Sequence, residues 1–364
     1  MDAHSFRSDN NAGLCPEALS ALTEAAQGHC VGYGDDAITA AALARFREVF
    51  GDDTEVFFVA TGTAANTLAI AALTEPWQRV VCHSHAHYND DESTAPERVT
   101  MCRTTAITPR GEPTRLAPDD LRRALAGGRG DVHQPAPGVL TLSNPTELGT
   151  IYTPAELADL AALAHDLGFR VHVDGARFAN AVAAWSRRAD VAPHAAARAL
   201  SVDAGVDALT FGGTKDGLAL GEAVLFFGGA RRPEVARAAA RFPFLRKSLG
   251  HLLSKHRFVS AQFERALGSG AWLRHADHAN AMAALLADGL RARGLAPAFP
   301  ADSNGVFVAL PPAIDRGLKA RGHGYYPFAS PIGQVERLMC SFDTRPAAIE
   351  ALLADVDALR EGAA

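Results

Sequence analysis

Short apolar runs recur along the first two thirds of the chain, separated by segments with apolar residues at helical spacing. Between these runs, the helical spacing is clearest in Ala64–Leu73 and in Pro154–Leu167, where Thr153 is a suitable N-cap and Gly168 a stop. This alternation predicts a largely parallel sheet with helices on both faces. The strands predicted from the apolar runs are Glu55–Ala60, Arg79–Cys82, Gly138–Ser143, Arg170–Val173, Ala208–Gly212 and Glu222–Phe227.

The pattern changes after Arg232 to long helices followed by a second short α/β set. We predict a helical stretch over Pro233–Leu267, with Pro243 as a candidate break, and a helix over Ala271–Arg293. The predicted domains are an irregular N-terminal arm (1–35), a large sheet domain (36–250), and a helical bridge with a small C-terminal α/β domain (251–364). The elements predicted for the small domain are strand Gly305–Leu310, helix Pro311–Arg321, a strand near Arg337–Cys340 and helix Arg345–Leu359.

The composition restricts the class of protein. With 48% hydrophobic and 21% charged residues, the chain can bury a sizeable core. A net charge of −6 without a long basic run argues against nucleic acid as the main partner. No stretch approaches the roughly 20 apolar residues that span a bilayer. The first residues do not resemble a secretory signal, and the five scattered cysteines lack CxxC spacing, so we expect a cytoplasmic protein with reduced thiols.

Lysine is rare, which limits where lysine chemistry can occur. Of 35 basic residues only four are lysines: Lys215, Lys247, Lys255 and Lys319. Lys215 follows a strand and sits in the small-residue turn Gly212–Gly217, where open α/β sheets place their ligands. Burial there would favour the neutral amine, which can form a Schiff base. A surface lysine in a turn is the alternative.

A carboxylate follows the preceding predicted strand. Asp174 ends the run Val171–Val173 and precedes Lys215 by about one βα unit. A pyridoxal phosphate (PLP) site needs such an ionised carboxylate beside the pyridine nitrogen, since it keeps the ring an electron sink. Arg177 could then contact the 3-oxygen side of the ring or a phosphate. The alternative is a helix N-cap aspartate with a surface arginine.

A third group of residues is suited to a single phosphate. The strand ending at Ala60 runs through Thr61 and Gly62 into a helix whose first residues include Thr63 and Ala64. Free N–H groups at a helix start bind anions. Neither GxGxxG nor GxxxxGK[ST] follows the strand, so a dinucleotide or nucleoside triphosphate is not favoured. An ordinary helix cap is the alternative.

Three histidines stand at alternate positions, His83, His85 and His87. Alternate residues of a strand share one face and could bind zinc, but no accompanying carboxylate has zincin spacing, so we predict no metal site. An imidazole stacked on a flat cofactor ring is favoured over polar loop histidines.

The order of these features resembles the aspartate aminotransferase-like (fold type I) PLP enzymes. Within them the chain is similar to the low-specificity L-threonine aldolases and phenylserine aldolases of the β-eliminating lyase group. The most specific strings are Gly212-Gly213-Thr214-Lys215 and Asp174-Gly175-Ala176-Arg177-Phe178. The resemblance runs nearly end to end and includes Ser8-Asp9-Asn10, Tyr33-Gly34-Asp35-Asp36, Thr61–Asn66, Ala86-His87, Asp91-Glu92, Thr146–Thr150, Ser254-Lys255 and Arg337–Ser341.

The resemblance implies a role for each matching position and an α/β fold with a large, mostly parallel sheet domain and a small C-terminal domain. Lys215 would hold PLP covalently, Asp174 would pair with its ring nitrogen and His87 would stack on the ring. Gly62, Thr63 and Ala64 would bind the phosphate, aided by Lys255 or Arg257 of a neighbouring subunit. Arg177 would lie near the 3-oxygen, Ser8 and Arg337 would bind the substrate carboxylate, and Tyr33 would shape the pocket.

The implied reaction is retro-aldol cleavage of L-3-hydroxy amino acids such as threonine, allo-threonine and phenylserine to glycine and an aldehyde. His87 is a candidate base, directly or through a water, and Glu147 is either a substitute base or structural. Asp216 departs from the family pattern, which more often has Asn or Gly after the lysine, and a carboxylate beside Lys215 would oppose formation of the neutral amine.

Other readings stay open at this point. The same residues would serve β-elimination of 3-hydroxy amino acids to an oxo acid and ammonia, or transamination or racemisation. A non-catalytic PLP-binding protein is a further alternative. The resemblance also implies a homo-oligomer, a dimer or a tetramer, with each site shared across the dimer.

Overall fold

A sheet buried on both faces forms the centre of the large domain in this computed structural model, which describes residues 5–361. Its strands are β1 (Thr54–Val59), β2 (Gln78–His83), β3 (Arg103–Ile107), β4 (Ala136–Ser143), β5 (Arg170–Gly175), β6 (Ala208–Gly212) and β7 (Glu222–Phe227). Within the described residues they form a seven-stranded sheet in the order β1-β7-β6-β5-β4-β2-β3. Neighbouring strands from β6 to β3 are parallel, and β7 is antiparallel to both β6 and β1. The predicted mostly parallel sheet is confirmed, with β3 added at its edge.

Two helical layers cover the sheet, because its inner strands are apolar on both sides. In β7, Val224 and Phe226 face one layer, and Leu225 and Phe227 face the other. The first layer holds α3 (Gly62–Leu73), α5 (Ala95–Thr100) and α10 (Pro233–Ser248). The second holds α2 (Ala37–Phe50), α6 (Pro118–Leu125), α7 (Pro154–Asp166), α8 (Phe178–Ala189), α9 (Pro193–Ala199) and α11 (Arg257–Gly268).

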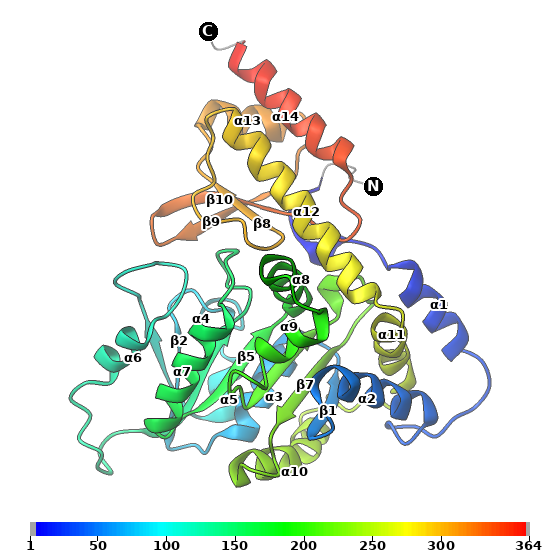
Figure 1. Cartoon of the computed structure of the whole chain (residues 1–364), viewed down its shortest axis with the longest axis vertical. Helices are drawn as coiled ribbons and strands as arrows, with labels where there is room; N and C mark the ends of the chain where they lie inside the picture. The colour runs from blue at the N-terminus through cyan, green and yellow to red at the C-terminus, as the bar shows by residue number, and fades with distance from the viewer. Residues whose placement is uncertain (1–4, 362–364) are drawn as a thin grey trace.

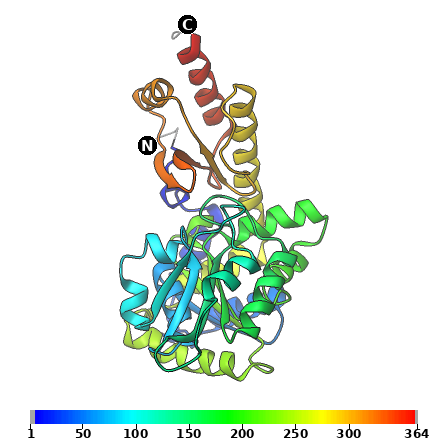
Figure 2. The same cartoon turned by 90° about the vertical axis from the view of Figure 1, so that its left-hand side faces the viewer.

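The small domain stands above one edge of the large one (Figures 1 and 2). The long helix α12 (Ala271–Ala292) runs between them. Three antiparallel strands in the order β8-β10-β9 pack against helices of this domain. The elements are β8 (Gly305–Val308), β9 (Tyr326–Ser330), β10 (Gly333–Met339), α13 (Pro312–Ala320) and α14 (Pro346–Glu361). The predicted strands near 305 and 337 and the two helices are confirmed, and β9 is an addition.

Two sequence predictions about helices were wrong. The arm predicted to be irregular contains the short helix η1 (Asp9–Asn11) and the helix α1 (Pro16–Ala25). Helix α10 continues through Pro243, and the predicted helical stretch is interrupted instead over residues 249–256. Pro243 is tolerated near the end of α10 although it removes one backbone hydrogen bond.

The N-terminal segment joins the two domains. Phe6 is buried in the core of the small domain, and its backbone bonds to Gly324 (N–O 2.7 Å) and Met339 (O–N 2.8 Å). A few residues later, the Cys15 N–H donates to the Gly217 carbonyl (2.9 Å), just after the short helix η2 (Thr214–Asp216). The segment therefore places Ser8 and Asp9 between the small sheet and the turn that carries Lys215.

Candidate functional site

The predicted aspartate and lysine meet at the carboxyl edge of the large sheet. β5 and β6 are paired in parallel, with Asp174 opposite Thr210. Asp174 lies near the end of β5, and Lys215 lies in η2 directly after β6. The Lys215 ammonium is close enough to Asp174 to lower the pKa of its carboxyl. The topology thus brings the two residues to one site, as the strand order predicted.

Asp174 is buried and remains ionised. Its Oδ2 accepts from Asn66 Nδ2 (2.9 Å), and its Oδ1 accepts from the Ala176 N–H (2.9 Å). Burial alone would raise the pKa of Asp174, but the charges of His87 and Lys215 and the backbone hydrogen bond lower it below its ordinary value. A buried, ionised carboxylate is what a pyridine nitrogen needs for protonation.

His87 begins the short helix α4 (His87–Asp90) and is fixed by a buried carboxylate. Its Nδ1 lies 2.9 Å from Glu92 Oε1, and the same oxygen accepts from Asn66 Nδ2 (2.8 Å). Burial lowers the pKa of His87, but the Glu92 hydrogen bond and the charges of Asp174, Glu147 and Glu92 raise it to about 8. Asn66 therefore ties the two carboxylates together, a role that neither it nor Glu92 had been given from the sequence.

The predicted phosphate cradle is the start of α3. Thr61 caps this helix, and its Oγ1 accepts from the Ala64 N–H (3.2 Å). A helix start presents N–H groups that have no partner within the helix. A methyl group added at Gly62 would meet no described atom within 4 Å, so open space adjoins these groups. The position fits a phosphate held by Gly62 and Thr63, whereas the Ala64 N–H is already bound by Thr61.

Arg177 is engaged by a residue with no predicted role. Its Nε and Nη2 donate to the two carboxylate oxygens of Asp9 (2.6 and 2.9 Å), and Asn304 Nδ2 donates to Asp9 Oδ2 (3.0 Å). Burial raises the pKa of Asp9, but Arg177 outweighs it and lowers that pKa to about 2. Asp9 thus holds Arg177 in place and links it to the small domain.

Arg337 comes from β10 and is free to bind an anion on its Nε side. Within the part of the chain that the structure describes, its Nε is buried without a hydrogen-bond partner. Its guanidinium stands over the Phe328 ring, 5.6 Å from the centroid. Arg177 and Glu147 both act electrostatically on Arg337, and Glu147 also acts on His87. The structure therefore brings Arg337, Glu147 and His87 to the same region.

Two acids adjoin the lysine turn. Glu222 Oε2 accepts from the Gly213 N–H (2.7 Å), and burial raises the pKa of Glu222 to about 7. Burial, with the nearby charge of Asp9, raises the pKa of Asp216 well above its ordinary value. A raised pKa makes the charged form of Asp216 less favourable than in water, which weakens the opposition that we expected from a carboxylate beside Lys215.

The three alternate histidines do not converge on one point. His83 Nε2 lies 3.1 Å from the Pro113 carbonyl, and His83 Nδ1 accepts from the His85 N–H. His85 faces Asp90 at 3.6 Å, and His87 faces Glu92. Each ring thus has its own partner, and His87 alone joins Asp174.

The remaining predicted residues fall into two places. Ser8 caps η1, where its Oγ accepts from the Asn10 N–H (3.2 Å), directly beside Asp9.

Tyr33 is half exposed, with its N–H bound to the Ser254 carbonyl (2.9 Å) and its ring beneath Lys247. Arg257 donates to Cys30 Sγ (3.0 Å) and to the Gly28 carbonyl (3.3 Å), and Lys255 is exposed. These contacts join two surface segments, residues 28–34 and 254–257, and not the group around Asp174.

Known proteins resemble this chain over most of its length. The family model described as beta-eliminating lyase matches residues 5–311. The chain belongs to this family. A low specificity L-threonine aldolase of Pseudomonas aeruginosa is 42% identical over 352 residues, covering 96% of each chain. Another from a Pseudomonas species is 41% identical over 355 residues, 97% of each chain.

The fold of this beta-eliminating lyase family member also has solved counterparts. A threonine aldolase structure from Leishmania major superposes with a TM-score of 0.84 at 27% identity, covering 99% of this chain and 100% of that one. A serine palmitoyltransferase of Sphingomonas wittichii, at 16% identity, shares the fold with a TM-score of 0.72, covering 98% and 87%. The predicted PLP fold type I is confirmed.

This member of the beta-eliminating lyase family is a PLP-dependent enzyme, and its residues fit that cofactor. Lys215 could bind it covalently, the ionised Asp174 would suit the ring nitrogen, and the open space at Gly62 could receive a phosphate. Among residues 5–361, no helix combines the length and apolar character needed to cross a membrane.

Proposed function

We propose that this chain is a low-specificity L-threonine aldolase, an aldehyde-lyase that cleaves L-3-hydroxy amino acids to glycine and an aldehyde. One observation carries the proposal: ionised Asp174, the adjacent Lys215 and the Glu92-bound His87 share one site. Identity of 41–42% to two threonine aldolases over nearly their whole length supports it. Threonine, allo-threonine and phenylserine-like amino acids are the proposed substrates.

Bound to Lys215, pyridoxal phosphate supplies an electron sink for the pair released when a Cα bond breaks. Asp174 would hold the proton on the ring nitrogen, and Asn66 and the Ala176 N–H hold the Asp174 carboxylate in place. His87 would stack on the ring, and Glu92 fixes the orientation of its imidazole. Arg177, held by Asp9, would serve the 3-oxygen side.

The substrate is oriented by its carboxylate. Arg337, with its buried and unpartnered Nε, binds this group together with Ser8. A fixed carboxylate determines which Cα bond stands perpendicular to the ring and therefore breaks. For cleavage of Cα–Cβ, the 3-hydroxyl must lose its proton.

His87 is the base that we assign, acting directly or through one water. A pKa of about 8 leaves a substantial neutral fraction at slightly alkaline pH, and matches the operating range of a general base. Its Nδ1 faces Glu92, so Nε2 is the nitrogen left for the hydroxyl proton. Glu147 is the second candidate, since it lies close enough to influence both His87 and Arg337.

A second copy of the chain would complete the site. A phosphate at Gly62 and Thr63 would have no cationic side chain beside it among the contacts described. Lys255 and Arg257 lie with Tyr33 on a separate surface. We assign these three residues to the site of a partner subunit in a homo-oligomer, a dimer or a tetramer. Five free cysteines, with only Cys30 exposed, agree with a reducing, cytoplasmic location.

A product analysis tests the function. The holoenzyme is incubated separately with L-threonine, L-allo-threonine and L-threo-phenylserine, and glycine, aldehyde and ammonia are quantified. Glycine and aldehyde in equal amounts establish the aldolase and rank the substrates. Ammonia and an oxo acid without glycine would make the enzyme an eliminase, and the base would then have to be sought at Glu147.

A further inference from the structure

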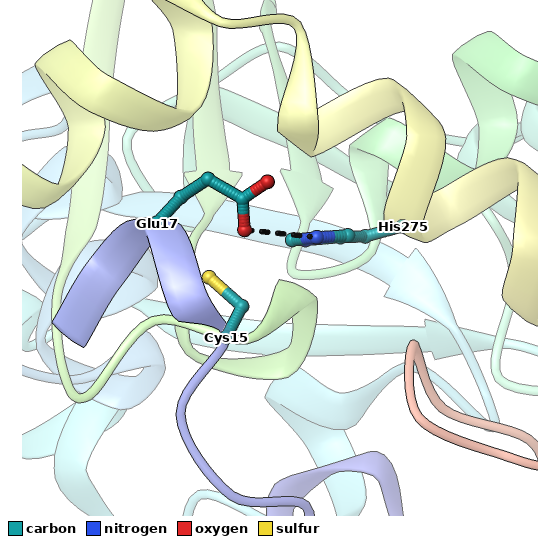
Figure 3. Close-up of side chains that lie close together, drawn as sticks. All are labelled: Cys15, Glu17 and His275. Carbon is teal, nitrogen blue, oxygen red and sulfur yellow. Dashed lines mark ion pairs between the residues drawn. The ribbon is translucent and has the colours of Figure 1, made fainter. Parts of the chain in front are cut away.

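A second cluster of metal-binding groups lies outside the cofactor site. It joins Cys15 and Glu17, at the start of α1, to His275 of α12 (Figure 3). The Cys15 Sγ, a Glu17 carboxylate oxygen and a ring nitrogen of His275 all lie within 4.8 Å of one another. Cys15 is fully buried, and the side chains of Glu17 and His275 are 24% and 14% exposed.

The histidine is oriented as metal-ligating histidines are. Its Nδ1 lies 3.3 Å from the Asp216 backbone carbonyl, which can only accept a hydrogen bond, so Nδ1 carries the proton. In the neutral ring, Nε2 then presents a lone pair. A backbone carbonyl that fixes the tautomer in this way is the usual outer partner of a metal-bound imidazole.

Glu17 provides the second, independent observation. Its Oε1 accepts from Arg274 Nη2 (3.0 Å), whereas its Oε2 is buried and has no hydrogen-bond partner among the described residues. This Oε2 faces His275 Nε2 at 3.5 Å. Two lone pairs directed at each other in a buried place are unfavourable unless a cation or a proton stands between them.

The distances and donor types select the ion. With metal–ligand bonds of about 2.0–2.3 Å, neighbouring ligand atoms of tetrahedral Zn²⁺ stand roughly 3.3–3.8 Å apart. The oxygen–nitrogen pair already has this spacing at 3.5 Å, and the sulfur lies within 4.8 Å of both atoms. A thiolate with an imidazole and a carboxylate is a ligand set for Zn²⁺ and not for Mg²⁺ or Ca²⁺.

We propose that Cys15, Glu17 and His275 bind one Zn²⁺ ion, with a water as the fourth ligand. On binding, the sulfur–metal bond replaces the S–H bond, and the proton goes to solvent. The Ala18 N–H, 3.3 Å from Cys15 Sγ, then donates to the thiolate. The ion would fasten α1 and α12 to the lysine turn, because Cys15 N–H holds Gly217 and His275 holds Asp216.

Metal binding by the PLP-loaded full chain tests this site. After chelation and dialysis, we expect one Zn²⁺ per chain on titration, a higher melting temperature with Zn²⁺, and, with Co²⁺ in its place, the intense visible bands of a tetrahedral site. Loss of an outer-shell partner costs about 10–100-fold in affinity, so Cys15→Ser and His275→Gln should each cost at least about 100-fold. Cys30→Ser is the matched control, because it removes an exposed thiol and should leave binding unchanged.

Three results would overturn the proposal. They are undiminished Zn²⁺ affinity in Cys15→Ser, loss of binding in Cys30→Ser, or a Co²⁺ spectrum typical of six ligands. Should the buried Cys15 variant fail to fold, Glu17→Gln keeps the thiol and removes one ligand charge. If Glu17→Gln and His275→Gln retain the cofactor spectrum and bind Zn²⁺ as the unaltered chain does, the site is rejected.

Discussion

Asp9 and Arg177 form a buried two-hydrogen-bond ion pair although 168 positions separate them, with N–O distances of 2.6 and 2.9 Å. The side chains are 1% and 13% exposed. Asp9 of the N-terminal segment thus already neutralises the positive charge of Arg177, the residue predicted to lie beside the cofactor.

Asp9→Asn should destabilise the apoprotein strongly. The variant keeps the shape of the side chain but leaves the Arg177 charge buried without its counter-ion, which costs about 3–5 kcal/mol of unfolding free energy. Urea denaturation measures the change. Asp119→Asn, which removes an exposed pair with Arg122, should have a much smaller effect. Equal losses in the two variants would contradict the special role of Asp9.

The His87 imidazole should titrate near pH 8 in the apoprotein. Because its folded pKa lies above the ordinary value of 6.5, protonation stabilises the fold fully below pH 6.5, and this stabilisation, about 2 kcal/mol, is lost as the pH rises through 8. NMR titration, assigned with His87→Asn, measures the pKa. Glu92→Gln should lower it, since the hydrogen bond to a carboxylate is removed. A His87 pKa at or below 6.5 in the unaltered protein would contradict this picture.

Lys215→Ala should abolish the covalent attachment of PLP and reduce turnover by at least about a thousand-fold. Borohydride reduction followed by peptide mass analysis locates the modified lysine. Lys319→Ala, in a surface ion pair with Asp315, serves as the control and should keep both properties. Full activity in Lys215→Ala would mean that the site has been placed wrongly.

Arg337→Ala should weaken substrate binding. Hydrogen bonds to a charged group contribute about 1.5–3 kcal/mol, so kcat/KM should fall by roughly 10–150-fold. Steady-state kinetics with L-threonine measures the loss, and the bound cofactor spectrum should not change. A normal kcat/KM would assign the carboxylate to another residue.

Arg257→Ala tests the shared site by complementation. If Arg257 acts in the partner's site, mixing inactive Lys215→Ala with a weakened Arg257→Ala chain should form hybrids in which one site has both native residues. Activity above that of the separate variants, after unfolding and refolding together, is the expected result. A mixture no more active than its components would place Arg257 in the site of its own chain.

The sequence predicted the buried strands and missed the exposed ones, for a physical reason. β6 and β7 are mostly apolar, whereas β3 reads Arg103-Thr104-Thr105-Ala106-Ile107 and lies at the sheet edge, where only Ile107 is buried. β9 contains Pro327, which argues against a strand unless it is at an edge, where β9 lies. Helix α1 begins after Cys15, which is not a typical cap.

In the candidate site, too, some residues could be predicted from the sequence and others could not. Lys215 and Asp174 could be predicted because parallel strands place their carboxyl ends at one edge. The hydrogen bonds from Asn66 to Glu92 and to Asp174 could not be predicted. Glu92 lies 26 positions and Asp174 108 positions from Asn66, and local sequence patterns do not indicate contacts between such distant residues. The roles of Tyr33, Lys255 and Arg257 depend on a second chain and stay predictions.

The contact between Asn304 and Asp9 has a consequence for biosynthesis. Asn304 leaves the ribosome 295 positions after Asp9, and Arg337 is later still. A growing chain can therefore complete the strands of the large sheet before the residue proposed to bind the substrate carboxylate is made. Newly made protein should therefore acquire the ability to bind amino acids only after synthesis has passed Arg337.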